Sequence, residues 1–188
     1  MIDRVLDMRG ISLNYGEIQL FSGLTSSLAT GANLLVTGSN GSGKTSLLKI
    51  LASQLAPTKG TFEIADNIYF PAEPTKPGFK KTREYLQLTG SAKIHSLNFI
   101  ESVVLKSADK KMANLSSGEF KAIALARVLS IKRSVYLLDE PTITLDKENI
   151  TGLNNAILEL NSRGHSVVIA TNNPEDFASL YCHEIRLG

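Results

Sequence analysis

Three apolar stretches, at residues 33–37, 134–138 and 166–170, run without the alternating polar positions of a half-exposed strand. Uninterrupted apolar strands are typical of a parallel sheet that helices cover on both faces. Between these stretches, apolar positions recur at helical spacing in residues 46–55 and 149–163. The pattern therefore predicts an α/β fold with a mainly parallel core sheet.

The N-terminal part of the chain has a different pattern. Residues 5–13 and 20–29 are mixed segments that flank a turn-prone Asn-Tyr-Gly sequence, and they predict a pair of antiparallel strands. Further short strands are expected at residues 61–64 and 67–70. We expect an antiparallel β part to precede the main sheet or pack beside it.

A segment from about residue 72 to residue 114 has no such apolar strand. It begins with a loop rich in proline and continues with a largely helical pattern over residues 82–106. A second helix is expected at residues 119–129, after an N-cap region of Asn, Leu and two Ser residues. We therefore expect a single domain, residues 1–188, with a short helical insertion at about 72–114.

Composition narrows the classes of function. The formal net charge of +2 is too small to indicate a nucleic-acid partner, and we expect none. Hydrophobic residues make up 43% of the chain, yet no stretch approaches the ~20 apolar residues of a membrane-spanning helix. The single cysteine, Cys182, excludes a disulfide within the chain. These values are typical of a globular domain, and if the protein works at a membrane, it docks on a partner there.

One glycine-rich motif lies between an apolar strand and a helix, as a phosphate-binding loop requires. It matches the pattern G-x-x-x-x-G-K-[ST] and, with the residue that follows it, supplies the candidate nucleotide-binding residues Gly38, Ser39, Asn40, Gly41, Ser42, Gly43, Lys44, Thr45 and Ser46. Glycines let backbone N–H groups converge on an anion, and the helix N-terminus adds positive potential. We expect Lys44 to reach the β- and γ-phosphates of ATP, and Thr45 to bind Mg²⁺. A plain Gly/Ser turn is the alternative.

Two carboxylates end the apolar strand at 134–138. Successive strand residues point to opposite sides, so Asp139 and Glu140 are expected to face different partners. We interpret Asp139 as a Mg²⁺ ligand and Glu140 as the general base, or the residue that positions the attacking water. An acidic pair that merely opens a loop is the alternative.

Together with these two motifs, residues 115–119, Leu-Ser-Ser-Gly-Glu before a helix, resemble the ATP-binding cassette (ABC) ATPase family across essentially the whole chain. The resemblance implies a P-loop NTPase fold and a head-to-tail dimer, in which Ser116 and Gly118 of one copy cover ATP on the phosphate loop of the other. It further implies that Asp146 is the aspartate of the family's D-loop, and that Tyr15 lies against the adenine ring.

Two positions depart from the family pattern. Asn172 stands where the family has a histidine, and asparagine can donate a hydrogen bond to the γ-phosphate but carries no charge. The family's Q-loop glutamine is replaced by Ala72 or, in a shifted alignment, by Glu73. We expect ATP binding and dimer closure to persist with slow hydrolysis in which Asn172 takes part. The alternative is that neighbouring side chains fill both roles.

Short segments, among them Leu-Phe-Ser-Gly-Leu at residues 20–24, are similar to the ATP-binding subunit of the cytochrome c maturation haem exporter. This similarity implies an integral membrane transporter subunit as partner and a cytoplasmic, peripheral location at the inner face of the cell membrane. The alternative is a soluble ABC protein that acts as a nucleotide-gated scaffold or as a weakly hydrolysing binding module.

Overall fold

The computed structural model describes residues 4–65, 68–70, 81–87 and 98–188. The chain divides into two compact units. The first comprises Met1–Phe70, Arg133–Glu140 and Leu160–Gly188, and the second comprises Pro71–Lys132 and Pro141–Glu159. The second unit contains the expected helical insertion and extends beyond it on the C-terminal side.

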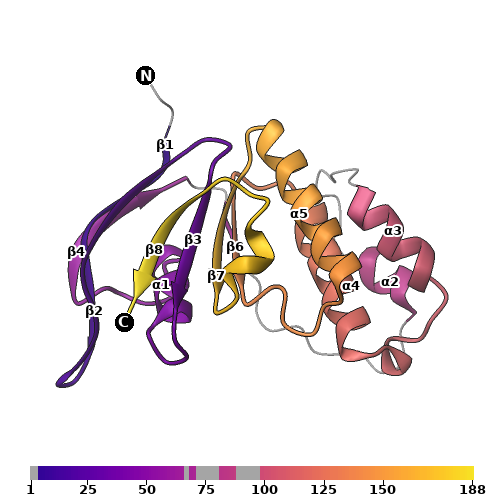
Figure 1. Ribbon diagram of the computed structural model, residues 1–188, viewed down its shortest axis with the longest axis horizontal. Coiled ribbons are helices and arrows are strands. Elements are labelled where there is room, and N and C mark those ends of the chain that lie inside the picture. The colour runs from indigo at the N-terminus through magenta and orange to yellow at the C-terminus, as the bar shows by residue number, and fades with distance from the viewer. Residues whose placement is uncertain (1–3, 66–67, 71–80, 88–97) are drawn as a thin grey trace. The chain divides into compact units, whose positions relative to one another are not determined.

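A three-stranded antiparallel sheet forms the N-terminal part of the first unit. Its strands are β1 (Arg4–Tyr15), β2 (Ile18–Ala29) and β4 (Lys59–Ile64), in the order β2-β1-β4. β1 and β2 join through a tight turn at Gly16, whose φ of 59° suits glycine better than any residue with a side chain. The predicted antiparallel pair is confirmed (Figure 1).

A five-stranded sheet forms the rest of this unit, and all its neighbouring strands are parallel. In spatial order the strands are β5 (Ile68–Tyr69), β6 (Val135–Asp139), β7 (Ser166–Thr171), β3 (Asn33–Gly38) and β8 (Cys182–Leu187). Every residue of β7 is buried, so both faces of the sheet are covered there. The predicted parallel core sheet is confirmed.

The edge strand β8 has no counterpart among the strands expected from the sequence. Its residues, Cys-His-Glu-Ile-Arg-Leu, include three polar or charged side chains that are exposed, and only Leu187 is buried. Such a segment carries no apolar run, because an edge strand needs to bury only part of one face. Its pairing with β3 therefore became visible only in the structure.

Helix α1 (Lys44–Leu51) packs between the two sheets of the first unit (Figure 1). Its buried leucines and isoleucine share one apolar core with side chains of β1, β3, β6 and β7. The helix was expected at residues 46–55, but it begins two residues earlier and ends at Leu51. This core holds the start of α1 firmly against the end of β3, and the glycine-rich loop joins these two ends.

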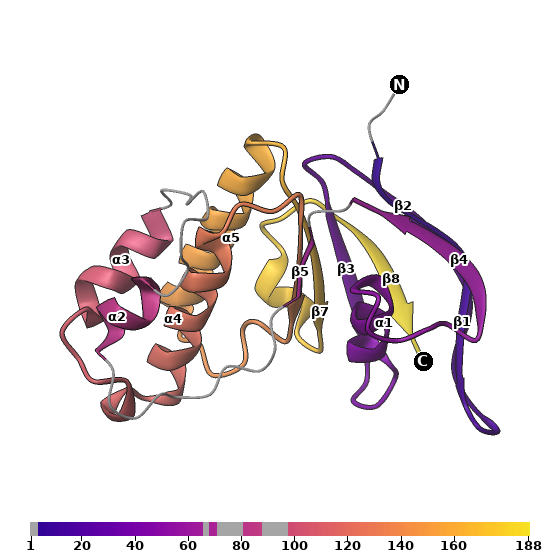
Figure 2. The same cartoon turned by 180° about the vertical axis from the view of Figure 1, so that it is seen from behind.

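The second unit is helical in its described residues. Its elements are α2 (Thr82–Gln87), α3 (Asn98–Ser107), the short 3₁₀ turn Met112–Asn114, α4 (Ser117–Ser130) and most of α5 (Lys147–Ser162). Helices α2 and α3 both contact α4 (Figure 2).

In the first unit, a second 3₁₀ turn, Pro174–Phe177, follows β7. No helix in the described parts of the chain is long and apolar enough to cross a membrane.

Candidate nucleotide site

Two glycines of the phosphate loop leave no room for a side chain. A Cβ on Gly38 would lie 2.4 Å from the carbonyl oxygen of Leu187 and 2.7 Å from Ser42 Oγ. A Cβ on Gly43 would lie 2.9 Å from the ring of Phe21. Both glycines have positive φ, 145° and 100°, which residues with side chains rarely adopt. Atoms of β8 and β2 therefore occupy the space that a side chain at either position would need, and the backbone conformation also favours glycine.

The loop ends at the N-terminus of α1, which is suited to an anion. Gly43 is the N-cap, no side chain caps the helix, and its first turn contains no acidic residue. The first N–H groups of a helix have no partner within it, and they carry partial positive charge. Ser42 is buried, and its hydroxyl has no hydrogen-bond partner among the described residues. A phosphate oxygen would satisfy these groups.

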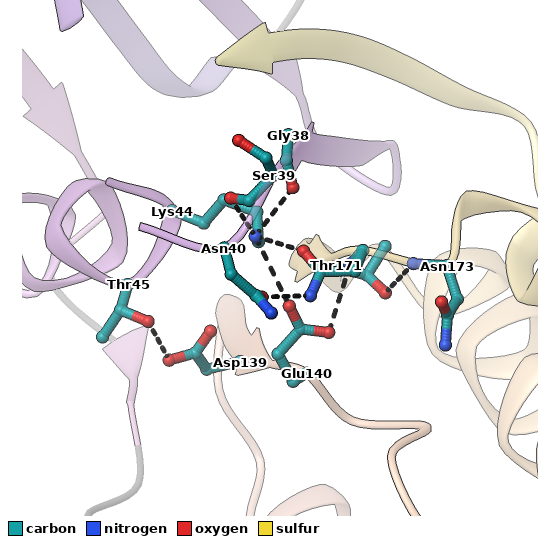
Figure 3. A network of polar contacts seen from close by, with 10 residues as sticks. Gly38, Ser39, Asn40, Lys44, Thr45, Asp139, Glu140, Thr171 and Asn173 are labelled. Atoms are coloured by element: carbon teal, nitrogen blue, oxygen red, sulfur yellow. Dashed lines mark hydrogen bonds and ion pairs between the residues drawn. The ribbon is translucent and has the colours of Figure 1, made fainter. Parts of the chain in front are cut away.

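Lys44 lies buried at the centre of a polar network (Figure 3). Its ammonium nitrogen donates to the carbonyl oxygens of Gly38 at 2.8 Å and Ser39 at 3.1 Å, and to Asn172 Oδ1 at 2.5 Å. Glu140 Oε1 is 3.6 Å away and forms an ion pair with it. A buried ammonium needs such compensation, since burial alone costs several kcal/mol. Phosphate oxygens could replace these acceptors.

Thr45 and Asp139 lie together at the start of α1 and the end of β6 (Figure 3). Thr45 Oγ1 donates to Asp139 Oδ2 at 2.7 Å. The second carboxylate oxygen, Oδ1, is buried without a partner in the described residues. A hydroxyl and a carboxylate with a free oxygen fit Mg²⁺, which is usually held by one or two carboxylates together with substrate phosphates and water.

Glu140 faces a different set of groups, as the alternation along the strand predicted. Its Oε2 accepts from the backbone N–H of Asn172 at 3.2 Å, and its own N–H donates to the carbonyl of Ala170 at 2.8 Å. Its φ of 42° is unusual for a residue with a side chain. Strain of this kind tends to occur where function requires it. The carboxylate is thereby held beside Lys44.

Asn172 connects the phosphate loop to the end of β7. Besides its bond to Lys44, its side-chain nitrogen donates to Asn40 Oδ1 at 2.5 Å. The next residue, Asn173, donates its backbone N–H to Thr171 Oγ1 at 3.0 Å, which secures the turn after the strand (Figure 3). Asn40 and Asn172 are both exposed, so incoming groups can reach them.

In the second unit, Ser116 caps helix α4 as the sequence predicted. Ser116 Oγ accepts from the N–H of Glu119 at 3.1 Å, and Glu119 Oε2 accepts from the N–H of Ser116 at 2.8 Å, which completes a capping box. Lys110 donates to Glu119 Oε1 at 2.5 Å. The hydrogen bond from Lys110, followed by the bond from the Ser116 backbone, lowers the pKa of Glu119.

Gly118 and Asp146 serve this unit in ways the motifs did not reveal. A Cβ on Gly118 would lie 2.5 Å from the carbonyl oxygen of Thr144. Asp146 Oδ1 accepts from the backbone N–H of Asn149 at 2.8 Å and from its side-chain amide at 3.0 Å, so it stabilises the start of α5. Gly118 therefore permits a close backbone approach and Asp146 caps a helix, apart from the nucleotide-binding roles predicted for them.

The remaining predicted positions differ in how much the structure says of them. Tyr15 ends β1 and is 53% exposed, which leaves its ring available to a ligand. Ser46 lies in the first turn of α1 and is half-buried, while Gly41 is exposed with a φ of 82°. Ala72 and Glu73 lie outside the described residues.

The family described as ABC transporter matches residues 21–143 of the chain. The chain belongs to this family. It is therefore an ABC ATPase, an enzyme that binds and hydrolyses ATP. The P-loop NTPase fold with its mainly parallel sheet follows from the same similarity and confirms the predicted fold class.

Relatives of this ABC ATPase span nearly its whole length. A putative ABC transporter ATP-binding protein of Methanosarcina acetivorans is 31% identical and is covered over 79% of its own length, with 98% of this chain. The cytochrome c biogenesis ATP-binding export protein CcmA of Rhodopseudomonas palustris is 30% identical, with 97% of this chain and 98% of the relative covered. A putative ABC transporter ATP-binding protein from Pyrococcus furiosus superposes with a TM-score of 0.78 at 25% identity, over 97% of this chain and 96% of that one.

The motifs of this ABC ATPase do not predict three contacts that the structure shows. They are the pairing of Asn40 with Asn172, the bond from Lys110 to Glu119, and the approach of the Thr144 carbonyl to Gly118. Each joins residues that stand apart in the sequence. A polar residue inside the phosphate loop and a lysine before the capping box were the available signals, but neither names a partner.

Proposed function

We propose that this ABC ATPase is the ATP-binding subunit of a transporter, and that it works as a dimer of two copies with an integral membrane partner. The observation that carries the proposal is that the start of α1 and the end of β6 converge at one phosphate-binding loop. Lys44 and Thr45 come from the helix, and Asp139 and Glu140 come from the strand end. On this proposal the protein is cytoplasmic and lies at the inner face of the cell membrane through its partner.

The residues of the site take distinct roles in this proposal. The loop residues 38–46 hold the phosphates of ATP through backbone N–H groups, and Lys44 exchanges its protein acceptors for phosphate oxygens. Tyr15, exposed at the end of β1, stacks on the adenine. Glu140 orients or deprotonates the attacking water. Asn172 offers an amide donor to the γ-phosphate.

Thr45 and Asp139 would hold Mg²⁺. The unpartnered carboxylate oxygen of Asp139 beside the Thr45 hydroxyl supports this assignment. When bound, the ion supplies positive charge against the charge that builds up on the phosphoryl oxygens. The protein's part is to keep the Thr45 hydroxyl and the Asp139 carboxylate together, 2.7 Å apart.

The second copy completes the site in this proposal. Ser116, Gly118 and Asp146 of one copy meet the ATP held by the other, and the N-terminus of α4 directs its partial positive charge at the γ-phosphate. Glu119 would oppose an anion there, but Lys110 already neutralises its carboxylate. The helix end therefore stays attractive to phosphate although an acidic residue stands in its first turn.

Cytochrome c biogenesis is the most specific role we propose, with haem or a related molecule as the exported group. It rests on the similarity to relatives named CcmA, at 30% identity in Rhodopseudomonas palustris and 32% in Ruegeria pomeroyi. A soluble ABC protein that acts as a scaffold or as a weakly hydrolysing module is the second candidate. Relatives named as the energy-dependent translational throttle protein EttA favour it: the Escherichia coli K12 protein is 28% identical, although the chain covers only 30% of it.

Pull-down from detergent-solubilised membranes separates these two candidates. The bait is Glu140→Gln, which keeps the size of the side chain but cannot accept a proton, and which should trap two copies around ATP. The matched control carries Lys44→Ala as well and should lose the dimer. Recovery of an integral membrane protein in the presence of ATP supports the transporter role, whereas recovery of soluble partners alone would refute it.

Slow hydrolysis is the kinetic part of the proposal, because an uncharged amide replaces a titratable ring at position 172. We expect Asn172→His to raise the single-turnover hydrolysis rate constant about tenfold. This is less than the roughly 10²–10⁴-fold typical of a complete general acid–base contribution, because the Asn172 amide already supplies a hydrogen-bond donor. A rate unchanged by this substitution, in an enzyme already as fast as its relatives, would refute the claim.

A further inference from the structure

We propose that Asn40 is a positioning residue for ATP hydrolysis, which acts by fixing the orientation of the Asn172 amide. The inference rests on the role proposed above for Asn172 and goes beyond it, since it names the group that orients the Asn172 amide toward the phosphate. The carrying observation is the hydrogen bond from Asn172 Nδ2 to Asn40 Oδ1, 2.5 Å long.

The orientation of the Asn172 amide follows from the chemistry of its neighbours. Lys44 has only donors, so the side-chain oxygen of Asn172 must face the Lys44 ammonium, 2.5 Å away. The amide nitrogen then points to Asn40, which presents its own oxygen as acceptor. A chain of donors runs from Lys44 through Asn172 to Asn40, and such chains strengthen each of their bonds.

Binding of ATP weakens the first hydrogen bond of this series, the one from Lys44 to Asn172. The phosphates compete for the ammonium of Lys44, so the bond from Lys44 to Asn172 can no longer be relied on to orient the amide. In the described residues the other side-chain bond of Asn172 is the one to Asn40. The terminal torsion of asparagine is broad and roughly two-fold, so an amide without that bond rotates readily.

The orientation decides whether Asn172 helps or hinders the reaction. Its amide nitrogen has two hydrogens, and one of them is used by Asn40. The second remains for a phosphate oxygen. A flipped amide would present its oxygen to the phosphate instead, and two negative dipole ends would meet. Asn40 therefore keeps the amide in the donating orientation during the chemical step.

This role predicts a specific pattern of kinetics. Loss of one orienting hydrogen bond, worth ~0.5–1.5 kcal/mol net, corresponds to a fall of roughly threefold to tenfold in the rate constant for hydrolysis. ATP affinity should change by less than about twofold, because the backbone N–H groups and Lys44 supply most of the binding. Both asparagines are exposed, so the fold should tolerate their replacement.

The test is a double-mutant cycle on the full-length protein, with single-turnover hydrolysis of Mg²⁺–ATP and the ATP dissociation constant as readouts. Asn40→Ala should lower the rate constant about threefold to tenfold in the wild-type background. In the Asn172→Ala background the same substitution should change it by less than about twofold. Asn40→Asp keeps the acceptor, so at saturating ATP it should retain a rate within about threefold of wild type, while its charge weakens ATP binding.

The possible outcomes separate this inference from the function on which it rests. Equal losses from Asn40→Ala in both backgrounds, or a change in ATP affinity alone, would overturn the positioning role. Wild-type hydrolysis by Asn172→Ala would refute the role of Asn172 itself, and the inference with it. Hydrolysis that survives Lys44→Ala would instead show that the proposed site is wrong.

Discussion

Replacement of Gly118 by alanine tests the contact between the start of α4 and the segment after β6. The added Cβ would lie 2.5 Å from the carbonyl oxygen of Thr144. Carbon and carbonyl oxygen normally approach to ~3.3 Å, so the overlap is about 0.8 Å. The obstacle is backbone rather than a mobile side chain, and the first turn of α4 or the Thr144 peptide must move.

The steric cost of this movement is partly offset, because alanine favours a helix more than glycine does. Forced overlap in a packed region costs ~1–3 kcal/mol, whereas glycine to alanine in a helix stabilises by at most ~1 kcal/mol. We expect Gly118→Ala to lower the free energy of unfolding by about 1–2 kcal/mol. For a chain of this size that corresponds to a fall of roughly 2–8 °C in Tm.

Gly152→Ala is the matched control. Its Cβ would also be close to a neighbour, 2.9 Å from Phe99, but the neighbouring atom belongs to a side chain rather than to the backbone. We expect this variant to be neutral, or more stable by up to ~1 kcal/mol. Urea and thermal unfolding of both variants measure the difference. A Gly118→Ala protein as stable as the Gly152→Ala protein would refute the steric argument.

Three further predictions concern the site and its surroundings. Thr45→Val removes the hydroxyl bonded to Asp139, and we expect the Mg²⁺ concentration needed for half-maximal hydrolysis to rise about tenfold or more, with ATP binding in EDTA little changed. The Glu119 carboxylate has a lowered pKa in the folded state, so its bonds stabilise the protein above the unfolded pKa of ~4.3 and are lost as the pH falls through the folded value. Lys110→Gln should therefore lower Tm at pH 6, and this loss should shrink as the pH falls through the folded pKa of Glu119. A loss that stays the same as the pH is lowered would contradict this cause. Thr144 has a φ of 72°, rare for a β-branched residue, so Thr144→Gly should stabilise the fold by about 1 kcal/mol in urea unfolding. A less stable variant would refute the claim that the strain relieved here exceeds the entropic cost of glycine.

Much of the first unit was predictable because its signals are local. The apolar stretches at 33–37 and 166–170 became β3 and β7, and an uninterrupted apolar strand has few stable places other than the middle of a covered sheet. The strand β8 was not predictable, because an edge strand with exposed His183, Glu184 and Arg186 satisfies little of the apolar pattern.

In the candidate site, too, the features with a local sequence signal were the predictable ones. The phosphate loop and the acidic pair after β6 were recognised from their residue order, since the spacing of glycines, lysine and hydroxyl suits neighbouring phosphates and a Mg²⁺ ion. The separate partners of Asp139 and Glu140 followed from the alternation of a strand. The roles of these residues in catalysis remain predictions.

The fold class, the family and the candidate phosphate-binding groups could all be predicted from the sequence, because they depend on patterns within a few residues of each other. Which groups meet is visible only in three dimensions: Asn40 with Asn172, Lys110 with Glu119, and Gly118 with the Thr144 carbonyl. Such contacts depend on where strands and helices end in space, to within a fraction of an ångström. That precision comes from the packing of the whole core, which no local pattern of residues contains.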